Sequence, residues 1–546
     1  MFQGWEDYIF EPDPFKNSDA YFKADEEVCG YALDVVARMG KDMNDERLLS
    51  FSDRFWKVFL YPWVGFFLQS LWEQQVRIQK FISRHESEEL VVDLVEDNLD
   101  WSFYTPIDFL RNGLYNFLYY EWIASRLIEK TAPKRWKITY RDRSREWEST
   151  FLNHPGRQPK DKKTLRQRFD SLVHIELESY SYIYGMNPLD GLAVNFLLKR
   201  YQKKESGLKS IIGVKNYQTT LRDSDFLLSP LELAKKFLPI AYGKALDEID
   251  KVKGGYVPGR IKIGSQQLQQ NVKFQLKRAL AIEHGEKIIG AQHGGHGYGT
   301  SKIHGLTAEI EYGFNGFITW GWTQEGDCQG NFIPLPSPWL SKFMDRHKPR
   351  SDKIILVGNS MNPFNARFSS SPQGNGVIHY RKEKVRFIKT LSPEHRQNFH
   401  YRPFPYSAWG FEDQTYIKRI FPEIKIVAKK FHQELLNCRI LVMDNPSTTL
   451  NIGMAANVPT LCFWKEDDFS FCPQARGLLD EMREVGMFFD TAISAANRLN
   501  KLGNDMQLWW EDEKVQEVRK QWIHQYGQIS KTWRKEWFLG LKSIYQ

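Results

Sequence analysis

Apolar residues recur at spacings of three and four along the first part of the chain, from Tyr21 to Lys130. Phe55, Phe59 and Trp63 are one example, and this spacing predicts packed α-helices. The next stretch, from Thr131 to Asp170, is basic, polar and contains prolines, which predicts an exposed connector.

Helical and strand-like runs alternate in the next part of the chain, from Phe226 to Trp322. Helical runs at Pro230–Ile249 and Gln266–His284 are followed by short apolar runs at Lys287–Ala291 and Gly316–Trp320, which we interpret as strands. This alternation is typical of parallel α/β layers.

A second α/β series follows, in which strand-like runs are separated by helical spacers. The strand-like runs are Lys353–Gly358, Asn398–Tyr401, Ile424–Val427, Arg439–Met443 and Thr460–Trp464. The last stretch, Leu508–Tyr545, is charged and rich in tryptophan, and it predicts terminal helices.

These patterns predict an α/β fold with two α/β domains. Three prolines between Pro334 and Pro338 exclude regular structure there, so we place the linker between the domains at Pro334–Arg350. The predicted division is a helical N-terminal region at 1–170, an α/β domain at 171–340, a second α/β domain at 350–505 and C-terminal helices at 506–546.

The charge of the chain is modestly basic. It has 75 Lys and Arg residues against 67 Asp and Glu, a formal net charge of +8, with local clusters at Arg141–Arg145 and Lys160–Arg168. This suits an anionic small substrate or a membrane surface. No nucleic-acid-binding motif is recognisable, so we expect no nucleic-acid partner. Five scattered cysteines and a start without a secretory signal favour the cytoplasm.

The most apolar window, Val58–Leu68, is shorter than the roughly 20 residues that a membrane-spanning helix needs. We interpret it as a buried helix pair. Trp56, Trp63 and Trp72 would also suit a lipid headgroup layer, so peripheral attachment to the inner face of the cytoplasmic membrane is the alternative.

The most informative stretch for function is the glycine-rich run Gly290–Thr300, which follows a predicted strand and contains five glycines and two histidines. Glycines leave backbone N–H groups uncovered, and a loop of this kind can hold phosphate or sugar oxygens. We therefore predict that Gln292, Gly294 and Gly295 bind a donor substrate and that His293 serves as acid or base, with a pKa near neutrality. The alternative is a tight, exposed surface turn.

A second candidate site is Asp444–Leu450, between a predicted strand and a predicted helix. The unpaired N–H groups at a helix start favour an anion, so we predict that Asn445, Ser447, Thr448 and Thr449 bind the donor phosphate. The alternative is an ordinary Ser or Thr cap of the helix.

A third candidate is Arg402 with Pro403, because an arginine on a fixed backbone can bind a phosphate or carboxylate. Its alternative is a surface arginine in a rigid loop. Glu309 and Glu311 could act as general base. A helix would aim them about 200° apart, so one would face the site and the other would be solvated.

A metal site is not expected. His284, His293, His296 and His304 lack the spacing of metal ligands, and no cysteine pair or HExxH helix accompanies them.

Several of these segments together resemble a family of bacterial transferases encoded in O-antigen and other surface-polysaccharide gene clusters. The resemblance covers most of the chain. It rests on Phe55–Lys57 and Tyr61–Trp63, Gly290–Thr300, Phe317–Trp322, Tyr401–Pro405 with Ala408–Gly410, and Asp444–Leu450 with Asn457–Thr460.

The resemblance implies a GT-B-like arrangement, with two Rossmann-like domains that face a cleft and a helical N-terminal addition. The second half is similar to the donor domains of Kdo and sialic-acid transferases, which hold CMP with an arginine/histidine-proline element and a Ser/Thr pair. Arg402-Pro403 and Ser447–Thr449 would fill these roles, although the usual histidine of the first element is missing here.

The sequence thus predicts a metal-independent glycosyltransferase without a cofactor. Its partners would be a nucleotide-sugar donor, which the resemblance implies to be CMP-linked, and a glycan or lipid-linked glycan acceptor of surface polysaccharide biosynthesis. A polyol-phosphate transferase or nucleotide-sugar epimerase on the same scaffold is one alternative. A non-catalytic protein that binds glycans or nucleotide sugars is the other.

Overall fold

A computed structural model describes most of the chain. The described residues are 10–153, 183–201, 207–208, 215–252, 254–264, 271–295, 297–323, 328, 330–359, 367–369, 372, 374, 376–404, 413–427 and 430–545. Predictions that concern Lys160–Arg168, His296, Pro405 and Ala408–Gly410 lie outside them.

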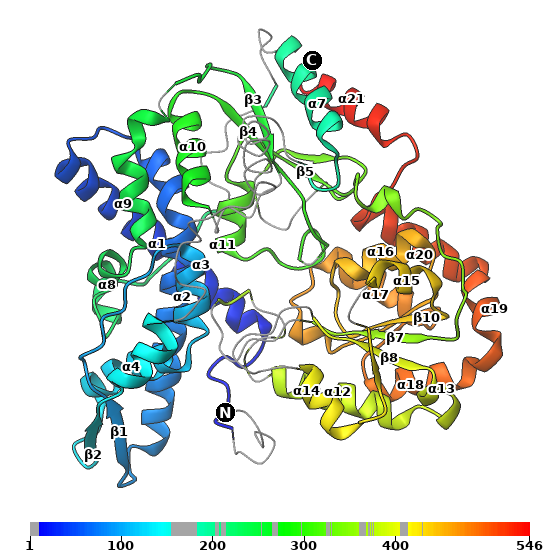
Figure 1. The fold of residues 1–546 in the computed structure, drawn as a ribbon, viewed down its shortest axis with the longest axis horizontal. Coiled ribbons are helices and arrows are strands. Elements are labelled where there is room, and N and C mark those ends of the chain that lie inside the picture. The colour runs from blue at the N-terminus through cyan, green and yellow to red at the C-terminus, as the bar shows by residue number, and fades with distance from the viewer. Residues whose placement is uncertain are drawn as a thin grey trace.

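The N-terminal region is built on two long helices, α1 (Ser18–Arg47) and α2 (Asp53–His85), followed by α4 (Phe117–Thr131) (Figure 1). α1 and α2 pack together so closely that a Cβ on Gly40 would lie 2.5 Å from the ring of Trp56. The apolar window Val58–Leu68 is buried as predicted, apart from the half-buried Val58, but it lies inside α2, which continues through Pro62, and does not form a helix pair.

The predicted connector after Thr131 contains a strand. β2 (Lys137–Arg141) pairs in parallel with β1 (Val91–Val95) and is mostly exposed, so the segment is exposed as predicted but contains a strand that the sequence did not indicate. The strand was missed because it is short and its polar composition resembles that of a loop.

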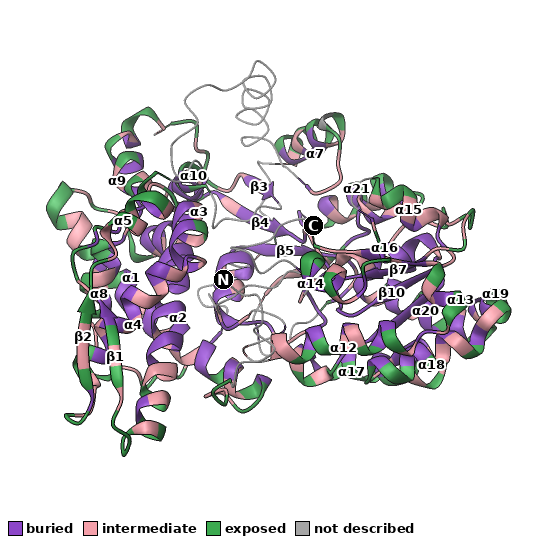
Figure 2. Cartoon of the chain, turned by 60° about the horizontal axis from the view of Figure 1, so that its bottom comes forward, coloured by how far each residue is buried: buried purple, intermediate pink, exposed green. Residues whose placement is uncertain are grey.

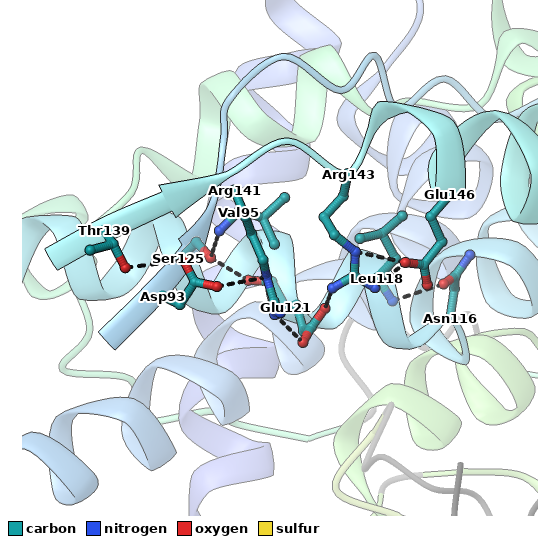
Figure 3. A network of polar contacts seen from close by, with 10 residues as sticks. All are labelled: Asp93, Val95, Asn116, Leu118, Glu121, Ser125, Thr139, Arg141, Arg143 and Glu146. Carbon is teal, nitrogen blue, oxygen red and sulfur yellow. Dashed lines mark hydrogen bonds and ion pairs between the residues drawn. The ribbon is translucent and has the colours of Figure 1, made fainter. Parts of the chain in front are cut away.

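The basic cluster at Arg141–Arg145 is largely neutralised within the molecule (Figure 3). Glu121 of α4 accepts hydrogen bonds from Arg141 at 3.0 Å and from Arg143 at 2.8 Å. Asp93 lies 3.4 Å from Arg141. Paired arginines carry little net charge, so this cluster offers a weak attraction for an anionic partner.

The first sheet contains four described strands in the order β3-β4-β5-β6, all parallel. Their bounds are Ile261–Gly264, Lys287–Ala291, Gly316–Thr319 and Phe332–Pro334. Successive strand residues point to opposite faces. Ile288 packs with the N-terminal helices and α10 (Val272–Glu283), whereas Ile289 packs with α7 (Pro188–Tyr201) and α21 (Trp533–Ser543).

The second sheet has six described strands, all parallel, in the order β12-β11-β10-β7-β8-β9. In chain order these are β7 (Ile354–Val357), β8 (Phe399–Arg402), β9 (Lys425–Ile426), β10 (Ile440–Met443), β11 (Thr460–Phe463) and β12 (Phe488–Phe489). This is the 3-2-1-4-5-6 order of the doubly wound Rossmann fold.

Helices cover both faces of the second sheet, and its strands are buried (Figure 2). α16 (Thr448–Ala456), α17 (Pro473–Glu484) and α20 (Glu513–Tyr526) share one apolar cluster. The other face is covered by α12 (Gly376–Thr390), α14 (Asp413–Ile420) and α18 (Ala492–Leu502). The predicted α/β fold with parallel sheets is therefore confirmed.

The C-terminal segment contacts both sheets. α20 packs on the second sheet, and the chain then returns to the first, where the N–H of Gln528 donates to the carbonyl of Trp320 at 2.9 Å. α21 continues along the first sheet, and the indole of Trp537 donates to the carbonyl of Pro336 at 2.8 Å. Within the described residues, no helix is long and apolar enough to cross a membrane.

Trp537→Ala tests how much the packing of α21 on the first sheet contributes to the stability of the protein. Trp537 is 3% exposed between α21 and the first sheet, so its removal should cost about 3–5 kcal/mol of unfolding free energy. The midpoint of urea unfolding measures this. Phe538→Ala, on the same helix with a 49% exposed side chain, should leave the midpoint nearly unchanged, and equal losses in both variants would contradict the assignment.

Candidate functional site

The candidate site lies where the strand order of the second sheet changes direction, between β7 and β10. The register aligns Val357 with Met443 on one side and with Arg402 on the other, so three strands end in one row. In doubly wound sheets, ligands bind outside the carboxyl ends of the strands at this switch point. The segment Asp444–Leu450 leaves β10 at this edge.

The Ser447–Thr449 segment forms the start of α16, as predicted. Ser447 is the N-cap residue, and within the described structure its side chain makes no capping hydrogen bond. All three hydroxyl residues are half-buried. The first N–H groups of a helix have no intrahelical acceptor, so this turn can bind an anion with both amides and hydroxyls.

The glycine-rich loop contacts this helix start directly. The N–H of Gly295 donates to Oγ1 of Thr448 at 2.9 Å. A Cβ on Gly295 would lie 3.1 Å from Cα of Thr448 and 2.5 Å from Nδ2 of Asn451, so only glycine fits at this distance. The loop after β4 and the turn after β10 therefore bring the carboxyl edges of the two sheets together.

Gln292 holds the glycine-rich loop in shape. Its buried Oε1 accepts hydrogen bonds from the backbone of Trp320 at 2.8 Å and from the indole of Trp322 at 2.9 Å. Its Nε2 donates to the carbonyl of Gly294 at 2.8 Å. The side chain of Gln292 thus positions the loop, and binding of a donor by this residue stays a prediction.

His293 lies in the same loop and faces Tyr298. The tyrosine hydroxyl is 3.3 Å from Nδ1 and 3.4 Å from Nε2, so it approaches the ring edge between the two nitrogens. Burial lowers the pKa of His293 to about 4. The expectation of a pKa near neutrality is therefore wrong: the imidazole is neutral at pH 7, because its charged form would lose solvation.

Glu309 and Glu311 both lie in a single π-helical turn, η7 (Ala308–Tyr312), and both are buried. The prediction that one of them is solvated is wrong. Glu309 pairs with Lys57 of α2, so it faces the N-terminal helices. Glu311 hydrogen-bonds Tyr298, and burial raises the pKa of its carboxyl to about 8 against the opposing effects of Arg278 and Tyr298.

Arg402 ends β8 at the same edge as Met443. Its guanidinium donates to the carbonyl of Val427 at 2.8 Å and lies over the ring of Phe431, 5.0 Å from its centroid. Burial lowers its pKa. Pro403 follows, half-buried, and fixes the backbone direction after the strand. The arginine is therefore held in place two strands away from the Ser447–Thr449 turn.

A cluster of buried charges beneath the switch point was not predicted. Nζ of Lys384 lies 2.5 Å from Asp413, 3.2 Å from the hydroxyl of Tyr401 and 3.6 Å from Asp444. Tyr380, one helical turn before Lys384, donates to Asp444 at 2.8 Å. The sequence held only a weak signal for this cluster. Tyr380 and Lys384 lie four residues apart, on one face of the predicted helix, within a charged run.

This cluster fixes the turn that carries the candidate site. Burial raises the pKa of Asp413, but Lys384 and Arg381 outweigh it and hold the pKa below its usual value, whereas burial raises the pKa of Asp444. Nδ2 of Asn445 donates to Asp444 at 2.6 Å and to the carbonyl of Val357 at 3.2 Å. Oδ1 of Asn445 is buried and has no hydrogen-bond partner among the described residues, so it could accept from a ligand.

Metal ligands do not gather at the site. Within the described part of the chain, no group of three or more His, Cys, Asp or Glu side chains is arranged to hold a metal ion.

Gly295→Ala should separate the loop from α16. Its Cβ would press on the backbone of Thr448, and overpacking of this kind costs about 1–3 kcal/mol. Thermal or urea unfolding should show the loss. Gly294→Ala is the matched control, since its Cβ would make an ordinary contact of 3.4 Å with the Thr448 hydroxyl. If both variants unfold like the wild type, the close contact is not important for stability.

Lys384→Met should destabilise the protein by about 3–5 kcal/mol, because it leaves two buried carboxyl groups without their common cation. The unfolding midpoint in urea measures the loss. Lys382→Met, an exposed lysine on the same helix, should be within about 0.5 kcal/mol of the wild type. A small effect of Lys384→Met would mean that the cluster is neutral or hydrated.

Comparison with known proteins identifies the family. The model of the LIC12162 family transferase matches residues 2–541. Among solved structures, the crystal structure of MurG from Acinetobacter baumannii is similar, with 10% sequence identity and a TM-score of 0.32, over 60% of this chain and 83% of that chain. A search of curated proteins found no match. Since the family model spans almost the whole sequence, the chain belongs to the LIC12162 family of transferases.

Proposed function

We propose that this transferase is a glycosyltransferase, which moves a sugar from a nucleotide-activated donor to a hydroxyl of a growing surface glycan. The observation that carries the proposal is the Ser447–Thr449 turn, a helix start at the switch point of a doubly wound sheet that touches the loop of a second parallel sheet. Two facing sheet edges can bind two substrates side by side.

In this proposal the helix start of α16 binds the phosphate that leaves with the nucleotide. Negative charge increases on the phosphate as its bond to the sugar breaks, and the N–H groups, the hydroxyls and Arg402 would stabilise it. Such a site works without a metal ion, so transfer should continue in excess EDTA. Oδ1 of Asn445 would accept a hydrogen bond from the bound nucleotide or sugar.

The donor, the acceptor and the product that we propose follow from the sequence resemblance. A CMP-linked ulosonic acid such as Kdo is the donor that we propose, with the O-antigen or another surface polysaccharide as the product. The acceptor would be a glycan or a lipid-linked glycan, which places the enzyme in the cytoplasm at the inner membrane face.

Nucleotide binding tests this proposal. CMP, UDP, GDP and dTDP are compared by thermal shift, because a ligand that binds the folded state raises its apparent stability. The best nucleotide is then titrated by calorimetry. Thr449→Val keeps the shape but removes a hydroxyl that would contact the charged phosphate, which costs about 1.5–3 kcal/mol, or about ten-fold or more in affinity.

Thr448→Val should have a similar effect on affinity and should in addition lower stability, since Oγ1 of Thr448 accepts the Gly295 hydrogen bond. Thr491→Val, at the exposed start of α18, is the control and should not change affinity. Unchanged affinity in both Thr448→Val and Thr449→Val would rule out the phosphate assignment. Turnover of a nucleotide sugar without any acceptor would instead indicate an epimerase.

A further inference from the structure

Tyr298 links the two titratable groups that the first sheet contributes to the site. Its hydroxyl lies 3.3–3.4 Å from both ring nitrogens of His293 and also hydrogen-bonds Glu311. His293 comes from the loop after β4 and Glu311 from η7, so residues 18 positions apart meet through one hydroxyl. The three side chains form a continuous path from the half-buried loop to a buried carboxyl.

The path begins next to the proposed phosphate site. His293 is two residues before Gly295, whose N–H donates to Thr448 at 2.9 Å. A substrate bound at the start of α16 would therefore lie close to His293. Within the described residues, the only hydrogen-bond partner of the imidazole is Tyr298, so one ring nitrogen can face a substrate while the other bonds the tyrosine.

The middle of the path is rigid. Tyr298 is 8% exposed, and its ring stacks on Phe317 of β5 with centroids 5.8 Å apart. Gly299, the next residue, has a φ of +69°, and a Cβ there would lie 2.6 Å from the indole of Trp322. The loop can therefore hold the hydroxyl at a constant distance from both of its partners.

The two ends of the path differ in their affinity for protons. Burial lowers the pKa of His293 to about 4 and raises that of Glu311 to about 8. Besides Tyr298, the charged group that faces Glu311 is Arg278 of α10, while Lys57 of α2 pairs with Glu309. A proton that reaches the path is thus held more tightly at Glu311 than at His293.

We propose that His293, Tyr298 and Glu311 form a proton relay that removes the proton from the acceptor hydroxyl. This inference rests on the proposed glycosyltransferase function and selects Glu311, not Glu309, as the final base. The acceptor oxygen bonds the sugar carbon while the bond from that carbon to the phosphate oxygen breaks, with its electron pair going to the phosphate. The acceptor proton moves to one nitrogen of His293, the proton on the other nitrogen moves to Tyr298, and the tyrosine proton moves to the Glu311 carboxylate.

The relay requires Glu311 to be ionised before each turnover. At pH 7, a group with a pKa of about 8 is about one-tenth ionised, so the rate of transfer should rise with pH, reach half its maximum near pH 8 and level off above about pH 9. His293 is neutral before and after the step. Only its tautomer changes, because the proton ends on the other ring nitrogen.

Infrared spectroscopy tests the buried acid without any substrate. A protonated carboxyl gives a carbonyl band that disappears on ionisation, and the wild-type band of Glu311 should titrate near pH 8 and be missing in Glu311→Gln. At pH 7 glutamine resembles the protonated acid, so this variant should fold normally. Because the Tyr298 hydrogen bond lowers the pKa, Tyr298→Phe should move the midpoint to higher pH. Tyr312→Phe, a buried tyrosine on η7, should not move it.

Transfer kinetics then test the relay itself. Nucleotide release from the donor in the presence of acceptor should fall about 10²-fold or more in Glu311→Gln and in Tyr298→Phe, with nucleotide affinity unchanged. Glu309→Gln should keep the wild-type dependence of rate on pH. If Tyr298→Phe transfers at the wild-type rate or leaves the band in place, the relay is wrong although the enzyme is a glycosyltransferase. If the wild-type protein transfers no sugar from any CMP-, UDP-, GDP- or dTDP-linked donor, the proposed function fails, and the relay with it.

Discussion

The hydrogen bond from Gly295 to Thr448 is the point on which the candidate site depends, because it joins two sheets whose strands are about 150 residues apart in the sequence. Each sheet alone offers only half of a site. Two neighbouring contacts keep the bond in place. Asn451 accepts from the indole of Trp522 at 2.9 Å and donates to the carbonyl of Tyr526 at 3.1 Å, so α16, α20 and the glycine-rich loop meet at one side chain.

The buried charges beneath the site are another constraint. Lys384, Asp413 and Asp444 come from α12, α14 and the end of β10, and none of the three is more than 7% exposed. Buried ion pairs seldom add much stability compared with apolar packing, but loss of one partner is costly. The cluster therefore favours one arrangement of these three elements, and the turn at Asp444–Ser447 is fixed as a result.

Local patterns were enough to predict the two strands that lead into the candidate site and the loops that follow them. Lys287–Ala291 and Ile440–Met443 are short apolar runs, and the glycines after one and the Ser-Thr-Thr turn after the other are visible in the sequence. The burial of Glu309 and Glu311 was not predictable, since the charged groups that face them, Lys57 and Arg278, are distant in sequence. The lowered pKa of His293 was missed because it depends on burial in the folded chain, which the local sequence does not show.

The contact between the sheets also orients the hydroxyl that would meet the substrate. A threonine hydroxyl has one hydrogen to donate and lone pairs to accept. Because Oγ1 of Thr448 accepts from Gly295, its own hydrogen is left to donate, and a hydroxyl that already accepts a hydrogen bond is a stronger donor. In the proposed function, this donor would bind an anion at the start of α16, where Thr448 is half-buried. In the proposed reaction, the same hydrogen bond would bring the proposed relay of the first sheet to the site and prepare the second sheet to bind the phosphate, so loss of this contact should weaken both halves of the reaction together.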